Sequence, residues 1–504
     1  MALSGIPPPL KWVSLLVWFL LWASGIDAAR VHVDLRSLLT DPARGWSVDT
    51  TVSFPGSSEF IQSTERWTIF RPPTYSASIR PGTEADIVKI IKLATSHNIP
   101  FLVRGAGHSY TTTIGNLRNG LNIDLSQFRS VEVDQTAQTV TIGPGVTMAD
   151  IFDPLYNAGF ELQTGSCSCP SLIGVTLGGG VGRLVGYHGL VIDALVSVRM
   201  VTAKGKLIEV SQDSNPDLFW GIRGAGVNFG VVTSATYRVK PLTNGGDVLN
   251  AEFIFSANMS SAYFRAVESY NDNLPPRLAS ITFIGYDAST NETRVSAGWT
   301  YSGPREEGLQ ALAPIFELGV PPSSLSMIPW NKLQASVGGG IDRLICQGNM
   351  IRDLYNLNLK NYSASTYETT FAKMEKFYAD NPGGRNSVVG LEFFPNHAMA
   401  AVPLDETAFP WRDSTAYVNP TFIWAEGDDA TKQAASKLGR EIRNDFATTS
   451  GYDAPTVFVN YARGDEPLEQ IYGRDKLPRL ARLKKAWDPK NFFSYNNGLP
   501  TRYP

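Results

Sequence analysis

Apolar positions recur at helical spacing in several parts of the chain. Between Glu84 and His97, Ile87, Ile90 and Ala94 fall on one face, and Thr83 can cap the first turn. This pattern predicts a helix. Similar patterns predict helices over residues 148–158, 260–271, 366–379 and 477–487, with a further helical piece near Leu218.

Alternating or continuous apolar runs predict strands. In the first half of the chain they cover residues 99–104, 120–125, 131–133, 139–142, 196–202, 206–210 and 230–239. Beyond Pro241 the strands become longer, at 279–286, 293–301 and 417–424, and helical segments separate them. This change predicts an α+β protein whose second region, residues 242–455, is a broad sheet flanked by helices.

Composition is that of an ordinary globular protein. The chain has 504 residues, 43% of them hydrophobic and 18% charged, with a net charge of -3. Nucleic-acid binding usually needs a strongly basic face, so this balance argues against a nucleic-acid partner.

The N-terminus has the features of a secretory signal peptide. Lys11 precedes an apolar run from Trp12 to Ala23, and small residues follow at Ala28. We expect cleavage near Ala28, which leaves no membrane segment; the alternative is an uncleaved signal anchor. Glycosylation sequons begin at Asn258, Asn291 and Asn361, so the sequence predicts an exported glycoprotein.

A glycine-rich turn, Arg104–Tyr110, directly follows the predicted strand 99–104. Glycines let a backbone approach a ligand closely, and successive N–H groups bind anions. His108 would then stand beside that ligand; the alternative is a tight turn with a surface histidine. A second glycine run, Gly178–Gly182, lacks the spacing of a dinucleotide fingerprint, so it indicates either a close ligand or loop packing.

Three cysteines are too few for a disulfide framework, and Cys167-x-Cys169 without a histidine cluster is a poor zinc site. Near the C-terminus, Asn460 and Tyr461 follow an apolar run. A tyrosine in that position is either half-buried structure or part of a catalytic site.

Together these motifs resemble the berberine-bridge-enzyme-like branch of the vanillyl-alcohol-oxidase (PCMH-type) flavoprotein superfamily, over residues 72–240 and 455–502. The sequence around Cys167 is most similar to that of fungal family members that act in secondary metabolism. The matching segments are Arg104–Tyr110, Cys167 with Gly178–Gly182, Asn215–Gly226, Asn228–Thr233, Asn460–Tyr461, Tyr472–Gly473, Leu477–Leu480 and Asp488–Phe493.

The resemblance implies a two-subdomain FAD-binding domain and a substrate domain with a large antiparallel sheet. The expected boundaries are 1–28 for the signal peptide, 29–241 for the FAD domain, 242–455 for the substrate domain and 456–504 for a segment completing the FAD site. In the family a histidine bonds the flavin 8α carbon and a cysteine bonds C6. His108 matches the first, and the spacing to Gly178 favours Cys167 over Cys169 for the second. Cys169 then pairs with Cys346 or stays free.

Tyr461 matches the family tyrosine that takes a substrate proton, and Tyr110 one that lines the same pocket. Some relatives carry a carboxylate on the strand after a Phe-Pro-x-Arg motif, but the strand 417–424 has none, so Asn419 or Thr421 would face the pocket. An aromatic pocket of Phe393, Phe394 and Trp411 is weighed against a place in the core. The residues expected to bind FAD are Arg104, Gly105, Ala106, Gly107, His108, Ser109, Cys167, Gly178, Gly179, Gly180, Gly182, Gly230, Val231, Val232 and Asn460.

The leading hypothesis is therefore a secreted FAD-dependent oxidase of an alcohol or a phenolic or polyketide-type metabolite, with O2 as acceptor. A carbohydrate oxidase, or a flavoprotein scaffold that steers a cyclisation without net redox chemistry, are the alternatives. A pure binding protein would not need both attachment residues and Tyr461. The sequence does not indicate the oligomeric state.

Overall fold

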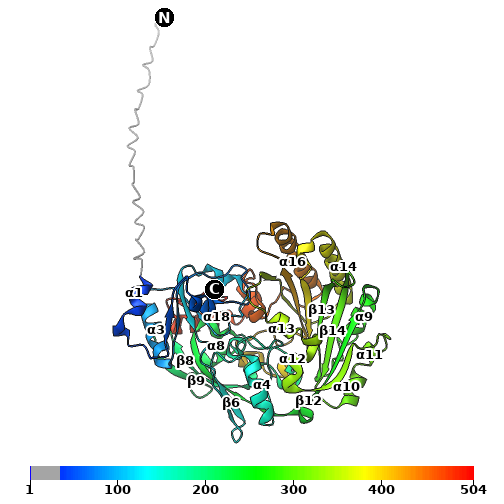
Figure 1. Cartoon of the computed structure of the whole chain (residues 1–504), viewed down its shortest axis with the longest axis horizontal. Helices are drawn as coiled ribbons and strands as arrows, with labels where there is room; N and C mark the ends of the chain where they lie inside the picture. The colour runs from blue at the N-terminus through cyan, green and yellow to red at the C-terminus, as the bar shows by residue number, and fades with distance from the viewer. Residues whose placement is uncertain (2–33) are drawn as a thin grey trace. The chain divides into compact units, whose positions relative to one another are not determined.

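Local sequence signals position the first helices and strands. In the computed structural model the helix predicted at 84–97 is α3 (Glu84–Ser96), and the Thr83 hydroxyl accepts a hydrogen bond from the Asp86 amide. The structure describes Met1 and residues 34–504, so the predicted signal peptide lies, apart from Met1, outside the described residues. Leu35–Pro504 form one compact unit (Figure 1).

Two smaller sheets build the first half of that unit. The first has the order β1-β2-β4-β3 and the second the order β5-β6-β10-β8-β9. Strands β2, β3 and β4 are parallel, and the second sheet is antiparallel. Their strands are β1 (Thr51–Ser53), β2 (Tyr75–Arg80), β3 (Phe101–Arg104), β4 (Gly120–Asp124), β5 (Val131–Asp134), β6 (Thr139–Ile142), β8 (Leu195–Thr202), β9 (Leu207–Ser211) and β10 (Gly230–Arg238).

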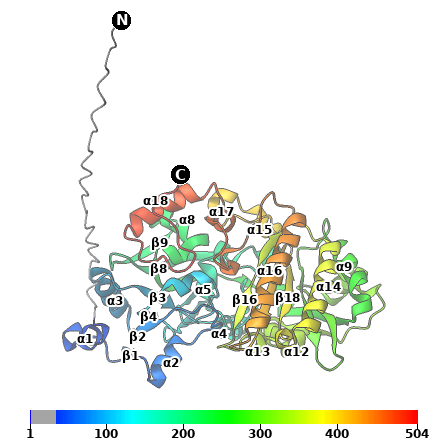
Figure 2. The ribbon, with the colours of Figure 1, turned by 90° about the horizontal axis from the view of Figure 1, so that it is seen from above.

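Short helices surround these sheets, and two two-residue strands, β7 (Phe160–Glu161) and β11 (Lys240–Pro241), pair beside them. Figure 2 shows α18 and α8 side by side, in agreement with the contacts between them. The helices are α1 (Leu35–Thr40), α2 (Ser58–Thr64), α4 (Met148–Asn157), α5 (Leu172–Thr176), α6 (Val185–His188), α7 (Val191–Ala194), α8 (Pro216–Ala225), α17 (Leu468–Tyr472) and α18 (Leu477–Trp487).

The predicted broad sheet is an eight-stranded sheet between residues 247 and 423. Its order is β15-β12-β14-β13-β18-β19-β16, every pair is antiparallel, and β17 also pairs with β19. The strands are β12 (Asp247–Phe255), β13 (Leu278–Asp287), β14 (Glu292–Tyr301), β15 (Ser324–Pro329), β16 (Arg352–Leu354), β17 (Leu357–Leu359), β18 (Val388–Phe393) and β19 (Ala416–Ile423).

Helices cover one face of this sheet (Figure 1). These are α9 (Ser260–Glu268), α10 (Arg305–Ala311), α11 (Ala313–Phe316), α14 (Ala364–Asp380) and α16 (Asp429–Thr449). Short helices α12 (Trp330–Gly340), α13 (Asp342–Ile345) and α15 (His397–Ala401) lie elsewhere around it. The fold is thus the predicted α+β type.

Strand alternation decides which residues of the sheet face the helices. On β18 the side chains of Val389, Leu391 and Phe393 are buried in the core beneath the helices. Because successive strand residues point to opposite faces, Gly390 and Glu392 face the other way. The opposite face of the large sheet is therefore free to form the wall of a cavity.

A fully buried ion pair fastens the C-terminal segment. The Lys484 ammonium donates to Asp488 at 2.8 Å and to the carbonyls of Asn228 and Phe493 at 2.8 and 2.7 Å. Asp488 also accepts from the Phe493 amide. Both side chains of the pair are 0% exposed.

Asp488→Asn should lower the free energy of unfolding by roughly 3 kcal/mol, because it leaves a buried ammonium without its counter-charge. Urea titration measures this. The matched control is Asp217→Asn. It breaks an exposed ion pair between Asp217 of α8 and Arg479, which lies on α18 like Lys484, and it should cost less than about 1 kcal/mol. Equal losses in the two variants would show that burial of the Lys484 pair does not matter.

Candidate active site

A cavity of about 1300 Å³ lies between the small sheets and the free face of the large sheet. The turn after β3, the segment around Cys167, the start of β10 and the C-terminal turn at Asn460 all contribute to its wall. Most of the predicted site residues line it: Arg104, Gly105, Ala106, Gly107, His108, Ser109, Tyr110, Cys167, Gly178, Gly230, Val231, Val232, Asn460 and Tyr461.

His108 is held face to face with Trp67, with ring centroids 4.4 Å apart and an interplanar angle of 18°. The Arg352 guanidinium lies 4.4 Å from the centroid of the Trp67 ring. Burial, with the nearby positive charge of Arg352, lowers the pKa of His108 to about 3. The imidazole is therefore neutral at ordinary pH, and its buried Nε2 atom has no hydrogen-bond partner among the described residues.

Hydrogen bonds made by two arginines, Arg66 and Arg104, fix the backbone of the glycine-rich turn. Arg104 donates to the buried Asp124 carboxylate at 3.0 Å and to the Glu65 carbonyl at 3.1 Å. Arg66 donates to the Ser109 carbonyl at 2.6 Å. These bonds hold the turn rigid, so that His108 points into the cavity in a defined orientation.

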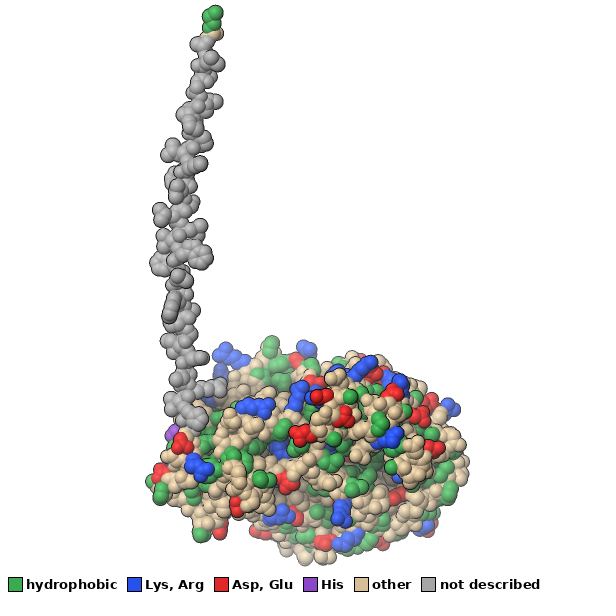
Figure 3. Space-filling view, turned by 45° about the horizontal axis from the view of Figure 1, so that its top comes forward, with side chains coloured by type: hydrophobic (Ala, Val, Ile, Leu, Met, Phe, Trp, Pro, Cys, Tyr) green, Lys and Arg blue, Asp and Glu red, His purple; other side chains and the backbone are tan. Residues whose placement is uncertain are grey.

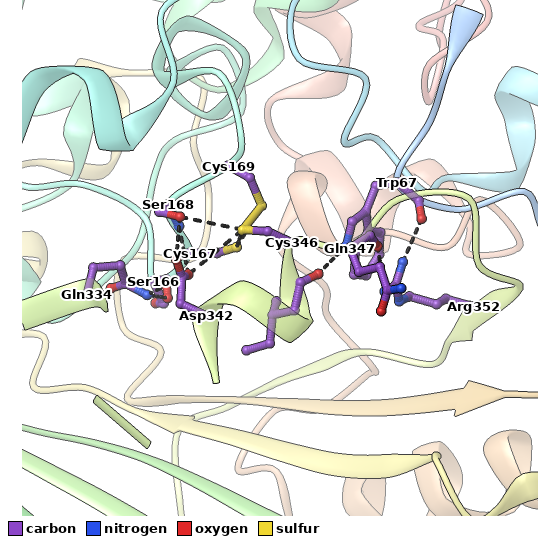
Figure 4. The surroundings of a disulfide bond; sticks show 11 residues. Trp67, Ser166, Cys167, Ser168, Cys169, Gln334, Asp342, Cys346, Gln347 and Arg352 are labelled. Carbon is purple, nitrogen blue, oxygen red and sulfur yellow. Dashed lines mark hydrogen bonds between the residues drawn. A yellow bond between two sulfur atoms is a disulfide. The ribbon is translucent and has the colours of Figure 1, made fainter. Parts of the chain in front are cut away.

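Cys167 is the free cysteine, because Cys169 and Cys346 form a disulfide (Figure 4). This settles the pairing that the sequence left open. Cys167 lines the cavity, and its Sγ atom, the Cys169 Sγ atom and a ring nitrogen of His108 all lie within 4.8 Å of one another. The two predicted attachment residues therefore meet in one place, although their sequence positions lie in different loops.

Tyr461 points to a carboxylate that the sequence analysis missed. Its hydroxyl donates a hydrogen bond of 2.7 Å to Glu392, a buried residue of β18. Burial and the negative charge of Glu392 raise the pKa of Tyr461 well above its ordinary value. Tyr461 is therefore a neutral phenol at ordinary pH.

Burial raises the pKa of Glu392, while the hydrogen bond from Tyr461 and the charge of Arg183 act in the opposite direction. Arg183 is itself buried, its pKa is lowered to about 10, and it donates to Gln334 at 2.7 Å. The strand that became β19 carries no Asp or Glu, as the sequence indicated, but it is not the only strand in this wall. The neighbouring β18 supplies a carboxylate, and Glu392 stands alone in the apolar run 388–394.

Asn356 joins the two predicted tyrosines. Its amide donates to the Tyr110 hydroxyl at 2.9 Å and to the Tyr461 carbonyl at 2.7 Å. Burial raises the pKa of Tyr110 well above its ordinary value. Both phenols therefore remain protonated, and no sequence motif marked Asn356 as their link.

Three of the residues predicted to contact the cofactor lie outside the lining of the cavity. Gly179, Gly180 and Gly182 do not line the cavity, because they pack closely against the protein itself: an added Cβ would lie 2.7 Å from Phe409, 2.4 Å from Val191 and 2.0 Å from the Thr164 carbonyl, respectively. Tight packing, the alternative reading of this run, accounts for these glycines.

For Phe393, Phe394 and Trp411 the structure supports a place in the core, the reading weighed against an aromatic pocket. Phe393 and Phe394 are 1% exposed and belong to the hydrophobic core, and Trp411 packs against that core. Asn419 and Thr421 do line the cavity, as expected from their alternation along β19.

The three predicted glycosylation sites, Asn258, Asn291 and Asn361, are all exposed. On the face in Figure 3, acidic and basic side chains are interspersed. Within the described part of the chain, no helix combines the length and apolar character needed to cross a membrane.

Comparison with known proteins identifies the family. Residues 75–211 match the FAD binding domain family, and residues 457–500 match the family described as berberine and berberine like. The chain is 45% identical to the FAD-linked oxidoreductase srdI of Neurospora crassa over 97% of this chain and 99% of that protein. The chain belongs to the berberine-bridge-enzyme-like FAD-linked oxidoreductases.

Solved structures of this fold agree. The Physcomitrella patens BBE-like 1 protein superposes with a TM-score of 0.78 at 22% identity, covering 90% of this chain and 98% of that one. A chitooligosaccharide oxidase gives a TM-score of 0.77 at 20% identity over the same shares. The two-subdomain FAD domain and large antiparallel sheet inferred from the sequence are thereby confirmed.

The cavity residues of this family member fit FAD. An unpartnered neutral imidazole nitrogen and a free thiol, held in one wall, are the groups that a covalently bound flavin needs. The turn Gly105–Ser109 and the start of β10 at Gly230 offer close backbone approach for the rest of the cofactor.

Proposed function

We propose that the protein is a secreted oxidase that holds FAD covalently through His108 and Cys167. It oxidises an alcohol or a phenolic or polyketide-type metabolite, with O2 as the electron acceptor. The observation that carries this proposal is the 2.7 Å hydrogen bond from Tyr461 to Glu392 in the cavity that also holds both attachment residues. The predicted signal peptide and the exposed sequons support secretion.

FAD, when bound, supplies hydride acceptance and the return of electrons to O2. The chain supplies proton transfer. The Tyr461 oxygen takes the proton of the substrate hydroxyl while its own proton passes to the Glu392 carboxylate. Oxidation of an alcohol carbon needs this proton to leave, since the carbonyl forms as the hydride departs.

The surroundings of Glu392 suit this task. It is buried, so the charge is poorly solvated and the carboxylate is a stronger base than an exposed one. Arg183 keeps the ionised form accessible by charge attraction. Asn356 holds the Tyr461 backbone, which fixes the phenol relative to the carboxylate.

A carbohydrate substrate is the second candidate. Beyond Glu392 the cavity wall carries a group of hydroxyl side chains on β14 and β15, which could bind the hydroxyls of a sugar: Ser296, Thr300, Ser324 and Ser326. The structural similarity to a chitooligosaccharide oxidase shows the fold alone, at 20% identity.

Glu392→Gln should slow substrate-driven bleaching of the flavin by on the order of 10²-fold, the usual scale for a general base. In the wild type the rate should fall as the pH drops through the raised pKa of Glu392, because only the ionised carboxylate accepts the proton. The variant should lose this acid limb. Anaerobic stopped-flow absorbance measures both effects.

Glu441→Gln, at a surface carboxylate of α16, is the control for that measurement and should leave rate and pH profile unchanged. A Glu392→Gln enzyme with the wild-type rate and an intact acid limb would remove Glu392 from the reaction.

Release of H2O2 from the purified protein should separate the two substrate classes. We expect peroxide with a panel of aromatic and polyketide-type alcohols and none with oligosaccharides. Peroxide with oligosaccharides alone would assign the enzyme to the second candidate. No peroxide from either panel, with the flavin intact and anaerobic bleaching absent, would contradict the oxidase proposal.

A further inference from the structure

Three sulfur atoms meet at the cavity wall (Figure 4). The Cys169–Cys346 disulfide joins the loop before α5 to the end of α13. The Cys167 Sγ atom lies 3.2 Å from that of Cys169 and 3.5 Å from that of Cys346. A ring nitrogen of His108 is within 4.8 Å of the sulfurs of both Cys167 and Cys169. Both cysteines are therefore near enough to the histidine for either to compete for the same ligand.

The disulfide prevents Cys169 from competing with Cys167 for that ligand. A free cysteine forms a new bond to carbon through its thiolate, and a sulfur already bound in a disulfide has no proton to lose and no thiolate to offer. Of the three cysteines, Cys167 alone lines the cavity. In this arrangement Cys169 is bonded to its partner, Cys346, at the end of α13 and is chemically blocked.

Polar contacts dock α13 on the cysteine loop independently of the sulfur bond. Asp342 accepts hydrogen bonds from the amide of Ser168, at 3.0 Å, and from its hydroxyl. Gln334 donates to Asp342 at 3.2 Å and also to the Ser166 carbonyl. This network holds the start of α13 against the loop.

The far end of α13 is fixed on the histidine side. Trp67, whose ring stacks on His108, donates its indole N–H to the Ile345 carbonyl at 2.6 Å. With both ends of α13 fixed, Cys346 is presented to Cys169. The contacts thus favour this pairing before the covalent bond forms.

Two features oppose exchange between Cys167 and the disulfide. Thiolate attack runs along the axis of the sulfur–sulfur bond, whereas Cys167 lies nearly equally far from both sulfurs and therefore beside that axis. Burial, assisted by the negative charge of Asp342, raises the pKa of the Cys167 thiol to about 12. Thiolate is consequently scarce near neutral pH, and exchange is slow.

We propose that the Cys169–Cys346 disulfide selects Cys167 as the cysteine that binds the flavin, by blocking Cys169. The proposal rests on the covalent flavin attachment proposed above. When the disulfide forms, two thiols lose their protons and pass two electrons to a disulfide oxidant of the secretory pathway. When the flavin link forms, the thiol and the ring C–H each lose a proton, the S–C bond forms, and two electrons pass to O2, giving H2O2.

Four variants test the selection: Cys167→Ser, Cys346→Ser, the double variant Cys167→Ser/Cys346→Ser, and the double variant Cys169→Ser/Cys346→Ser. Each is precipitated in acid and digested, and its flavin-bearing peptides are identified by fluorescence and mass spectrometry. Alkylation before digestion maps the free thiols. Acid-stable flavin on the His108 peptide reports that each variant has folded around its cofactor.

In the wild type we expect flavin on His108 and Cys167. Cys167→Ser should carry flavin on His108 only, because Cys169 remains blocked. Cys167→Ser/Cys346→Ser frees the Cys169 thiol, and flavin should now appear on the Cys169 peptide. Cys346→Ser should give a mixture of Cys167 and Cys169 links.

The matched control is Cys169→Ser/Cys346→Ser, which also lacks the disulfide but should keep flavin on Cys167. If that control is linked and Cys167→Ser/Cys346→Ser never carries flavin on Cys169, the disulfide does not make the selection and the proposal is overturned. Exclusive use of Cys167 in Cys346→Ser would overturn it equally. A wild type without flavin on any cysteine would instead refute the second covalent link, while alkylation would still report the disulfide.

Discussion

The hydrogen bond between Tyr461 and Glu392 joins the last segment of the chain to the middle of the large sheet, and the arrangement of the cavity depends on it. A buried carboxylate is costly unless its charge is met by hydrogen bonds and opposite charge. Glu392 receives the first from Tyr461 and the second from Arg183. Satisfying this one group therefore requires the C-terminal turn, β18 and the loop after α5 to converge at the same point.

The wall of the cavity that carries His108 depends on burial in the same way, but burial there keeps a side chain uncharged. His108, which stacks on Trp67, is kept neutral by burial and by the nearby charge of Arg352. A neutral imidazole with a free nitrogen can bond to a carbon atom, whereas a protonated one cannot. Under the proposed function, the neutral wall with His108 and Cys167 would hold the flavin, and Glu392 in the same cavity would accept the proton.

Much of this could be predicted from sequence because the signals were local. The cap at Thr83 and the apolar spacing that follows gave α3, and the motifs around His108 and Tyr461 indicated the family and the cavity. Glu392 was missed because strand order is not local. The strand after Phe409–Arg412 has no acid, but pairing places the carboxylate of the preceding strand, β18, in the same wall. Alternation along β18, together with a single acid in an apolar strand, was the available signal.

Whether Cys169 pairs with Cys346 or stays free could not be decided from the sequence for the same physical reason. Cys346 is 177 residues away, and only the docking of α13 brings it near. The glycine run shows the reverse case, since Gly179, Gly180 and Gly182 form a local motif, and in the structure they pack closely in the protein interior. Residue type indicated where the backbone is crowded, and the structure shows what crowds it.

The central claim is that Tyr461 and Glu392 act as one proton relay. The most direct test is a double-mutant cycle on the rate of anaerobic flavin reduction, with Tyr461→Phe, Glu392→Gln and the double variant. If the two groups act in series, the double variant should be about as slow as the slower single variant, because breaking either link already removes the path. Effects that multiply in the double variant would show that the two residues act independently, and would contradict the relay.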